Sequence, residues 1–226
     1  MRRLWNGRVD QWSDTVGTSP AFACLRERML DLAAPTAADR CLELGAGAGF
    51  LTVPLARRVA SVLAVDLSPA MLESLRDQAA QVAGTVTTQT ADMAQLNQPA
   101  GSFDLIMSSY AMHYLLDEDK TALLLRMWDW LTPGGRVVIS DMMLGRSLDR
   151  HHRQVLADKA SAMLRQGPSG WWRLLKNIAR IGSGRGRLHP CTPAWWTQAL
   201  HTAGYTAVRY EHVSSEAGIV VGTRPG

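Results

Sequence analysis

The segment Glu43-Leu-Gly-Ala-Gly-Ala-Gly49 combines one carboxylate with three glycines. It overlaps the end of the short apolar run 40–45. Gly45, Gly47 and Gly49 let a ligand approach the backbone, and the N–H groups that open the following helix can bind it. Glu43 adds a negative charge just before this turn. The turn alone is equally typical of a tight connection that binds nothing, so its meaning depends on the residues around it.

Carboxylates also stand at the ends of the next two predicted strands. Asp66 lies about 20 residues beyond the glycines, where an acid can accept hydrogen bonds from both hydroxyls of a ribose, with Leu67 beside it. Its alternative role is a cap on the following helix. Asp92 can accept a hydrogen bond from an adenine amino group, and Met93 can pack on the ring. The three strand ends together predict a ligand that contains a nucleoside.

A group that can move a proton follows the fourth predicted strand, in Ser108-Ser-Tyr-Ala-Met-His-Tyr114. His113 is the first candidate for a general base because histidine titrates near neutral pH. Tyr110 is the second candidate. A purely structural His113, which packs and orients the loop, fits the sequence equally well. Ser108, at the strand end, is expected to contact the nucleoside ligand.

Short apolar runs alternate with amphipathic segments, which is the pattern of a parallel sheet covered by helices on both faces. Strands are expected at 40–45, 61–66, 85–90, 103–108, 136–140, 206–213 and 218–222, and helices at 20–32, 50–60, 70–82, 117–131 and 194–203, with a turn at 133–135. Ligands of such α/β sheets bind beyond the carboxyl ends of the strands. The candidate residues are therefore expected at one edge of a single domain over 1–226.

Positive charge is concentrated in the segment 144–190, which has ten Arg and Lys against two Asp, a net charge of +8 in a chain of net charge +4. We predict a helical basic insertion that caps an acceptor pocket and attracts an anion. A solvated basic helix face is the alternative. The expected substrate contacts are His151, Trp171, Arg185 and His189. Trp5 and Trp12 suggest that 1–19 forms a lid over the site.

Five segments taken together resemble the motif series of class I S-adenosylmethionine-dependent methyltransferases, namely 41–50, 62–72, 90–96, 103–115 and 131–141. The nearest subgroup is the broad small-molecule (type 11) one that includes the ubiquinone and menaquinone enzymes. The resemblance implies an α/β fold, a doubly wound, mostly parallel seven-stranded sheet. Its last strand would be antiparallel, and the helical insertion would follow the fifth strand.

The same resemblance implies S-adenosyl-L-methionine as cofactor and S-adenosyl-L-homocysteine as product. Glu43 and the glycine backbone would hold the methionine end of the cofactor. Asp66 would bind the ribose, and Asp92 with Met93 would hold the adenine. The implied reaction is methyl transfer to a small metabolite, aromatic or anionic in character.

Three other functions are consistent with parts of the sequence. A dinucleotide-binding dehydrogenase would also have a glycine turn and an acid at the end of the second strand. However, the glycines here are spaced Gly-x-Gly-x-Gly instead of Gly-x-Gly-x-x-Gly, and Glu43 would repel a diphosphate. An RNA methyltransferase would use the basic insertion to contact phosphates. A catalytically silent partner subunit would bind the cofactor and transfer nothing.

Several classes of protein are disfavoured by composition. The sequence has no apolar run long enough for a membrane span, and the first ten residues do not resemble a secretory signal. Cys24, Cys41 and Cys191 are scattered without metal-binding spacing, so no metal is expected. We expect a cytoplasmic monomer or homodimer that acts on a small-molecule substrate, with nucleic acid only as the alternative above.

Overall fold

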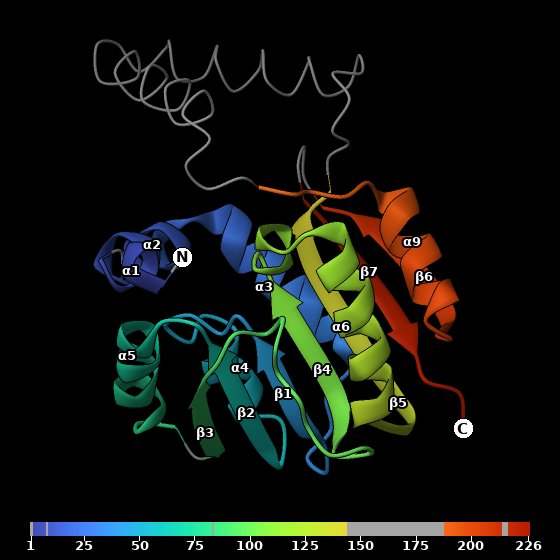
Figure 1. Cartoon of the computed structure of the whole chain (residues 1–226). Helices are drawn as coiled ribbons and strands as arrows, with labels where there is room; N and C mark the ends of the chain where they lie inside the picture. The colour runs from blue at the N-terminus through green and yellow to red at the C-terminus, as the bar shows by residue number, and fades with distance from the viewer. Residues whose placement is uncertain (1, 8, 83, 144–187, 214–216) are drawn as a thin grey trace.

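The computed structural model describes residues 2–7, 9–82, 84–143, 188–213 and 217–226. These residues form a seven-stranded sheet with the order β3-β2-β1-β4-β5-β7-β6 (Figure 1). Neighbours from β3 to β5 are parallel, whereas β7 runs antiparallel to both β5 and β6. The predicted doubly wound, mostly parallel sheet with an antiparallel last strand is confirmed. The strands are β1 (Arg40–Leu44), β2 (Ser61–Asp66), β3 (Thr85–Thr90), β4 (Phe103–Ser109), β5 (Leu131–Met142), β6 (Thr206–His212) and β7 (Ala217–Thr223).

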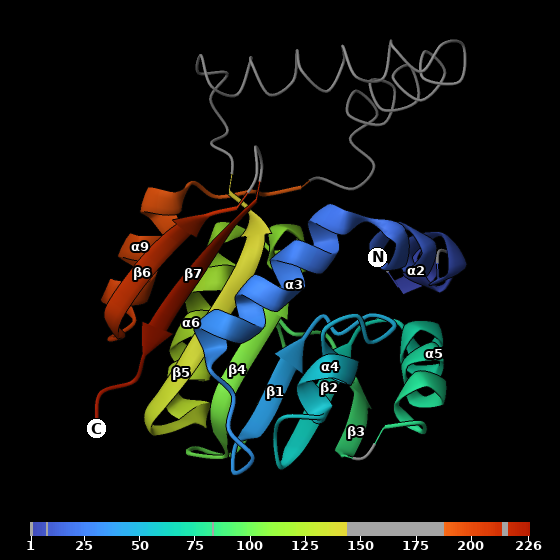
Figure 2. The same ribbon diagram turned by 180° about the vertical axis from the view of Figure 1, so that it is seen from behind.

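Helices cover both faces of the sheet. The helices α6 and α9 lie on the face turned to the viewer in Figure 1, and α3 lies on the opposite face, which Figure 2 shows. The short helices α1 and α2 lie above the carboxyl ends of β1 and β2. The described helices are α1 (Arg2–Asn6), α2 (Val9–Thr18), α3 (Pro20–Ala33), α4 (Thr52–Ala56), α5 (Pro69–Ala79), the 3-10 turn η1 (Met112–Tyr114), α6 (Asp117–Trp130) and α9 (Pro193–Thr202).

Alternate side chains of the central strands pack in two separate hydrophobic cores, one on each face of the sheet. In β4, Ile106 packs in the cluster that contains α6 and α9, whereas Leu105 and Met107 pack with α3 and α4. Successive side chains of a strand point to opposite faces, and all three of these are fully buried. A central strand buried on both sides explains why the apolar runs of the sequence are continuous instead of alternating.

Three local features differ from the sequence predictions. The helix expected at 50–60 is only Thr52–Ala56, because the chain must turn so that Ala60 N–H can donate to the Asp39 carbonyl (3.0 Å). Strand β5 begins at Leu131, before the expected turn, and its register against β4 shifts around that turn. Helices α1 and α2 were not predicted at all, and α1 is only five residues long.

The predicted basic insertion 144–190 lies outside the described residues, except for 188–190. Whether it is helical and covers the site therefore stays a prediction. Among the described helices, none combines the length and the apolar character that a bilayer crossing requires.

Candidate active site

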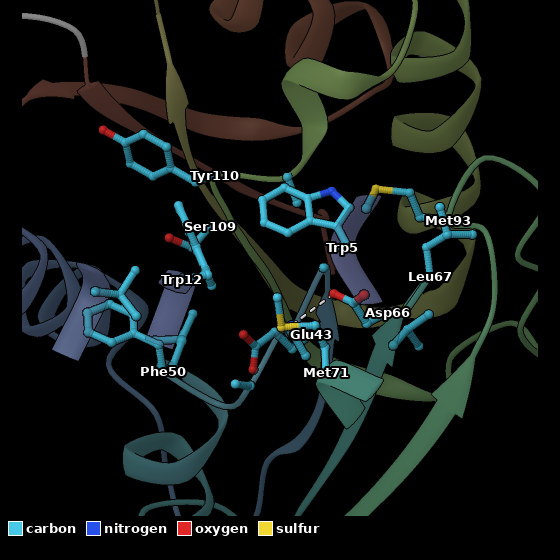
Figure 3. Close-up of a pocket in the computed structure, with 18 of the residues that line it drawn as sticks. Trp5, Trp12, Glu43, Phe50, Asp66, Leu67, Met71, Met93, Ser109 and Tyr110 are labelled. Carbon is cyan, nitrogen blue, oxygen red and sulfur yellow. Dashed lines mark hydrogen bonds between the residues drawn. The ribbon is translucent and has the colours of Figure 1, made fainter. Parts of the chain in front are cut away.

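A cavity of about 280 Å³ lies at the carboxyl ends of β1, β2, β3 and β4 (Figure 3). Its wall also includes residues of α1, α2 and α3. This is the edge of a doubly wound sheet where ligands bind. The predicted cofactor residues in the lining are Glu43, Gly45, Gly47, Asp66, Leu67, Asp92 and Met93. Gly49 and Ser108 are absent from the lining, and their positions are described below.

The glycine turn has the tight backbone that the sequence predicted. Gly45 has φ +75°, and a Cβ there would lie 2.2 Å from the Ala111 Cβ, so the loop after β4 packs directly on the turn. The N–H groups of Gly45 and Ala46 both donate to the Val65 carbonyl, at 2.8 and 3.0 Å. At Gly49 (φ +98°) a Cβ would instead meet Leu75 at 3.2 Å. Gly49 thus allows the packing of α5, and Gly45 allows the approach of two loops.

Alanine at Gly45 is expected to destabilise the protein by about 2–3 kcal/mol, because left-handed backbone strain adds to a steric clash. Gly101 is the matched control, since it has φ +63° and open space around its missing Cβ. Gly101→Ala should cost only about 1 kcal/mol, the strain alone. Urea unfolding of both variants measures the difference. Equal losses would contradict the close packing of Ala111 on the turn.

Glu43 is the most buried carboxyl group of the cavity wall. Its side chain is only 2 % exposed, and Thr52 Oγ1 donates a hydrogen bond to its Oε2 (2.6 Å). Burial raises the pKa of Glu43 to about 8, against the lowering effect of the Thr52 hydrogen bond. The side chain is therefore largely neutral at pH 7 in the empty cavity. A cation bound beside it would favour its ionised form.

Asp66 links the glycine turn to the end of β2. Its Oδ2 accepts a hydrogen bond from Gly47 N–H (2.9 Å), and its Oδ1 accepts one from Ser68 N–H (2.8 Å). Burial raises the pKa of Asp66, although these backbone N–H groups lower it. The cap of α5 is Ser68, whose Oγ accepts from Met71 N–H. Because Ser68 caps that helix, the carboxylate of Asp66 lies against the cavity without serving as the cap.

Asp92 and Met93 lie at the end of β3, on the far side of Asp66. Asp92 Oδ1 accepts a hydrogen bond from Ala94 N–H (2.9 Å), and Arg126 Nη2 donates to the Ala94 carbonyl (2.9 Å). These bonds fix the loop in a defined shape. The Met93 Cε lies 3.5 Å from the position of a Cβ on Gly45. The thioether therefore packs between the third strand end and the glycine turn.

The loop after β4 differs from the prediction in one position. Ser108 is fully buried, and its Oγ donates to the Leu44 carbonyl (2.9 Å), so it ties β4 to β1 and its side chain faces away from the cavity. Ser109 lines the cavity in its place. Tyr110 also lines it, from a left-handed backbone with φ +52°. Burial raises the pKa of Tyr110 to about 12, so its phenol is a hydrogen-bond donor at neutral pH.

His113 is buried beside the cavity and is not part of its described lining. Its Nδ1 donates a hydrogen bond to Asp141 Oδ1 (2.5 Å), which also accepts from Met142 N–H (2.7 Å). A carboxylate only accepts hydrogen bonds, so Nδ1 is the ring nitrogen that carries a proton in this contact, and Nε2 is the other ring nitrogen. The His113 ring packs on Tyr114 with centroids 4.2 Å apart.

The N-terminal helices contribute two indole rings to the cavity. Trp5 of α1 and Trp12 of α2 both line it and contact each other edge to face, with centroids 5.6 Å apart. Asn6 Oδ1 accepts a hydrogen bond from Ser68 Oγ (2.7 Å), which attaches α1 to the start of α5. Closure of these helices as a lid over a bound ligand stays a prediction.

Three of the expected substrate residues, His151, Trp171 and Arg185, lie outside the described residues. His189 is described and is absent from the lining. Its N–H donates to the His113 carbonyl (2.7 Å), and its carbonyl accepts from Lys120 Nζ (2.5 Å). His189 thus fastens the described end of the basic segment to the loop that carries His113.

Sequence reasoning missed several residues of this site. Phe22, in the predicted helix 20–32, lines the cavity together with Phe50, Tyr114 and Ser13. The partner of His113 was missed as well. Asp141 lies at the end of β5, a strand end of the kind that marks this edge, but no sequence spacing relates it to His113, 28 positions earlier.

Comparison with known proteins identifies the same region. Residues 41–135 match the family described as "Methyltransferase domain". The chain is 32 % identical over 123 residues to the aklanonic acid methyltransferase DauC of a Streptomyces species, which covers 53 % of this chain and 55 % of that protein. The chain thus spans about half the length of this curated relative.

Solved structures show the same fold over nearly the whole chain. An S-adenosylmethionine-dependent methyltransferase from Mesorhizobium loti superposes with a TM-score of 0.66 at 23 % identity, over 92 % of this chain and all of that one (100 %). The magnesium protoporphyrin IX methyltransferase ChlM of Synechocystis, solved with bound S-adenosylhomocysteine, gives a TM-score of 0.68 at 19 % identity, over 99 % of this chain and 97 % of that one. Residues 41–135 thus resemble a methyltransferase domain, and the solved structures show that the chain has the fold of these enzymes.

Proposed function

We propose that this protein transfers a methyl group from S-adenosylmethionine to a small-molecule acceptor. The observation that carries the proposal is the charge of the cavity. Its described lining contains three acids, Glu43, Asp66 and Asp92, one at each of three successive strand ends, and no Lys, Arg or His. Such a wall suits a nucleoside ligand that carries a positive charge and no phosphate. It disfavours the diphosphate of a dinucleotide.

The shape of the wall supports the same cofactor. Gly45 and Gly47 have no side chains, so the methionine end can lie close to the backbone of the turn, and Glu43 offers a counter-charge for its ammonium group. Asp66 can accept from the ribose hydroxyls. Asp92 and Met93 can hold the adenine at the end of β3. These assignments fit the donors and acceptors that the cavity presents.

Methyl transfer requires little covalent chemistry from the protein. When bound, S-adenosylmethionine would supply a methyl group on a sulfonium, with S-adenosylhomocysteine as the leaving group when a lone pair of the acceptor bonds to the methyl carbon in line with the breaking carbon–sulfur bond. The chain must hold the acceptor in that line and exclude water, which can supply most of the acceleration. Trp5, Trp12 and Tyr110 surround the cavity and can provide both functions. An acceptor hydroxyl also needs a base for its proton, and the phenol of Tyr110 stays protonated at neutral pH.

The proposal is tested by calorimetry with S-adenosylmethionine and with NAD, followed by transfer of a labelled methyl group to a panel of small molecules. We expect micromolar binding of S-adenosylmethionine alone and at least one labelled product. Binding of NAD in its place would overturn the proposal. Cofactor binding without any labelled product would favour the silent partner subunit. Labelling of RNA, with binding that weakens steeply with salt, would favour the RNA enzyme.

Replacement of His113 by asparagine tests the predicted general base. The asparagine amide can still donate to Asp141, but it lacks the Nε2 lone pair. If His113 takes the proton, kcat should fall about 100-fold with little change in cofactor affinity. His201→Asn, at an exposed site on α9, is the control. Full activity of His113→Asn would show that His113 only holds the loop.

A further inference from the structure

Six aromatic side chains line the cavity, and most of them contact one another edge to face. Phe22 is central, with its ring centroid 5.2 Å from Tyr110, 5.8 Å from Trp12 and 6.1 Å from Phe50. These rings come from α2, α3 and the loops after β1 and β4, so only the tertiary fold brings them together. Trp5 and Tyr114 extend the set, with centroids 5.8 Å apart.

Phe50 and Tyr110 lie at one end of the cavity, whereas Trp5 lies between Tyr110 and Met93 (Figure 3). Figure 3 shows Leu67 and Met93 on one side, Phe50 and Tyr110 on the other, and Glu43 between them. The proposed nucleoside contacts occupy the first side. The methionine end of the cofactor would reach Glu43, which leaves the space beside Phe50 and Tyr110 for the acceptor.

The charges of the lining restrict what this end can bind. A carboxylate or phosphate on the acceptor would meet no cationic side chain among the described lining residues, and it would lie close to Glu43. A cationic acceptor would lie beside the sulfonium, and like charges a few ångströms apart repel strongly in a low-dielectric site. An uncharged acceptor pays neither penalty. The expectation of an anionic acceptor therefore has no support from the described wall.

Two hydroxyl groups give the aromatic end some polarity. Ser13 Oγ of α2 is buried and has no hydrogen-bond partner among the described residues, although Ser13 lines the cavity. The Tyr110 phenol is the second, and it is protonated at neutral pH. A buried hydroxyl without a partner is costly, so an acceptor hydroxyl placed there would satisfy it.

We infer that the acceptor is an uncharged, planar aromatic molecule that carries a hydroxyl group, bound between Phe22, Phe50, Trp12 and Tyr110 with its hydroxyl near Ser13. Flat rings fill such a site with edge-to-face and stacked contacts, which a saturated ring of similar volume makes less well. This inference rests on the proposed function and narrows it to one class of acceptor.

Binding of four related probes tests the inference. The protein is first titrated with S-adenosylhomocysteine, and the saturated complex is then titrated at about pH 7 with 2-naphthol, 2-naphthoate, 2-naphthylmethylamine and decahydro-2-naphthol. These probes are respectively neutral and flat, anionic, cationic, and neutral but saturated. We expect 2-naphthol to bind at least about tenfold more tightly than each of the others.

Each other outcome has a definite meaning. Equal or tighter binding of 2-naphthoate or of the amine overturns the uncharged acceptor, and equal binding of decahydro-2-naphthol overturns the planar one. Failure of 2-naphthol to bind a complex that has taken up S-adenosylhomocysteine overturns the inference and leaves the proposed function standing. Failure of S-adenosylhomocysteine itself to bind overturns both.

Leucine variants locate the probe in the cavity. Phe22→Leu and Phe50→Leu should each weaken 2-naphthol about fivefold and leave S-adenosylhomocysteine affinity within about twofold. Tyr210→Leu is the matched control, since Tyr210 is an exposed aromatic on β6 outside the cavity lining. It should change neither affinity. Unchanged 2-naphthol binding in both phenylalanine variants would place the acceptor elsewhere and overturn the assignment.

Discussion

Replacement of Asp66 by alanine is expected to weaken S-adenosylmethionine binding about 100-fold or more. Asp66 is buried beside the glycine turn and faces the cavity, where its carboxylate can accept hydrogen bonds from two ribose hydroxyls. Each charge-assisted bond of this kind contributes about 1.5–3 kcal/mol. Isothermal titration calorimetry of the variant and the parent protein measures the loss directly.

The loss must be separated from damage to the turn, because Asp66 also accepts from Gly47 and Ser68 N–H groups. Asp66→Asn keeps the size and one acceptor oxygen, so it should fold and still bind the cofactor weakly. Asp77→Ala, at an exposed site on α5, is the control for removal of a negative charge nearby. Wild-type affinity in a folded Asp66→Ala variant would contradict the ribose assignment.

Glutamine at Glu43 is expected to stabilise the empty protein at pH 8 and to impair cofactor binding. A carboxyl group whose pKa is raised from 4.5 to about 8 keeps its proton in the folded state after the unfolded chain has lost it. Stability is therefore full below about pH 4.5 and falls as pH rises to 8. Between pH 6 and pH 8 this one group removes about 2 kcal/mol of unfolding free energy. The neutral glutamine carries no such penalty.

Cofactor affinity should have the opposite pH dependence. A cationic ligand favours ionised Glu43, and below pH 8 that ionisation opposes binding, so the affinity of the parent protein should fall about 50-fold from pH 8 to pH 6. A proton is released on binding, which calorimetry in buffers of different ionisation enthalpy can detect. Glu43→Gln should bind weakly and with little of this pH dependence.

Glu73→Gln is the control for these measurements, because Glu73 is exposed on α5. It should follow the parent protein in both stability and affinity. Two results would contradict the interpretation of Glu43. One is a difference in unfolding free energy between Glu43→Gln and the parent protein that is the same at pH 6 and at pH 8. The other is a cofactor affinity of the parent protein that does not change with pH.

The stability cost and the binding function of Glu43 have the same origin. The carboxyl group is buried next to a space that is ready for a cation, and the sheet cannot supply one from its own side chains. Buried carboxyl groups with raised pKa values are typical of functional sites for this reason. Asp141 is buried as well, but its Oδ1 is hydrogen-bonded to His113 Nδ1 and to Met142 N–H, so it has partners within the protein.

The sequence by itself determined the sheet and the strand-end acids that line the cavity. Apolar runs and glycine or proline punctuation mark local events, and residues just after strands must converge when those strands are parallel. Glu43, Asp66 and Asp92 were therefore identifiable without coordinates. Apart from the start of β5, the strand boundaries agree with the predictions within a few residues, because each short apolar run is bounded by its own turn residues.

Only the tertiary structure decided the aromatic part of the cavity wall. Phe22 and Phe50 occur in segments whose apolar residues look like ordinary core, and the pairing of His113 with Asp141 joins the ends of two different strands. Ser108, predicted at the site, instead ties β4 to β1, because a one-residue step along a strand turns the side chain to the other face. Contacts between distant elements leave no periodic signal in the sequence, since the packing that creates them is fixed only when the whole sheet is assembled.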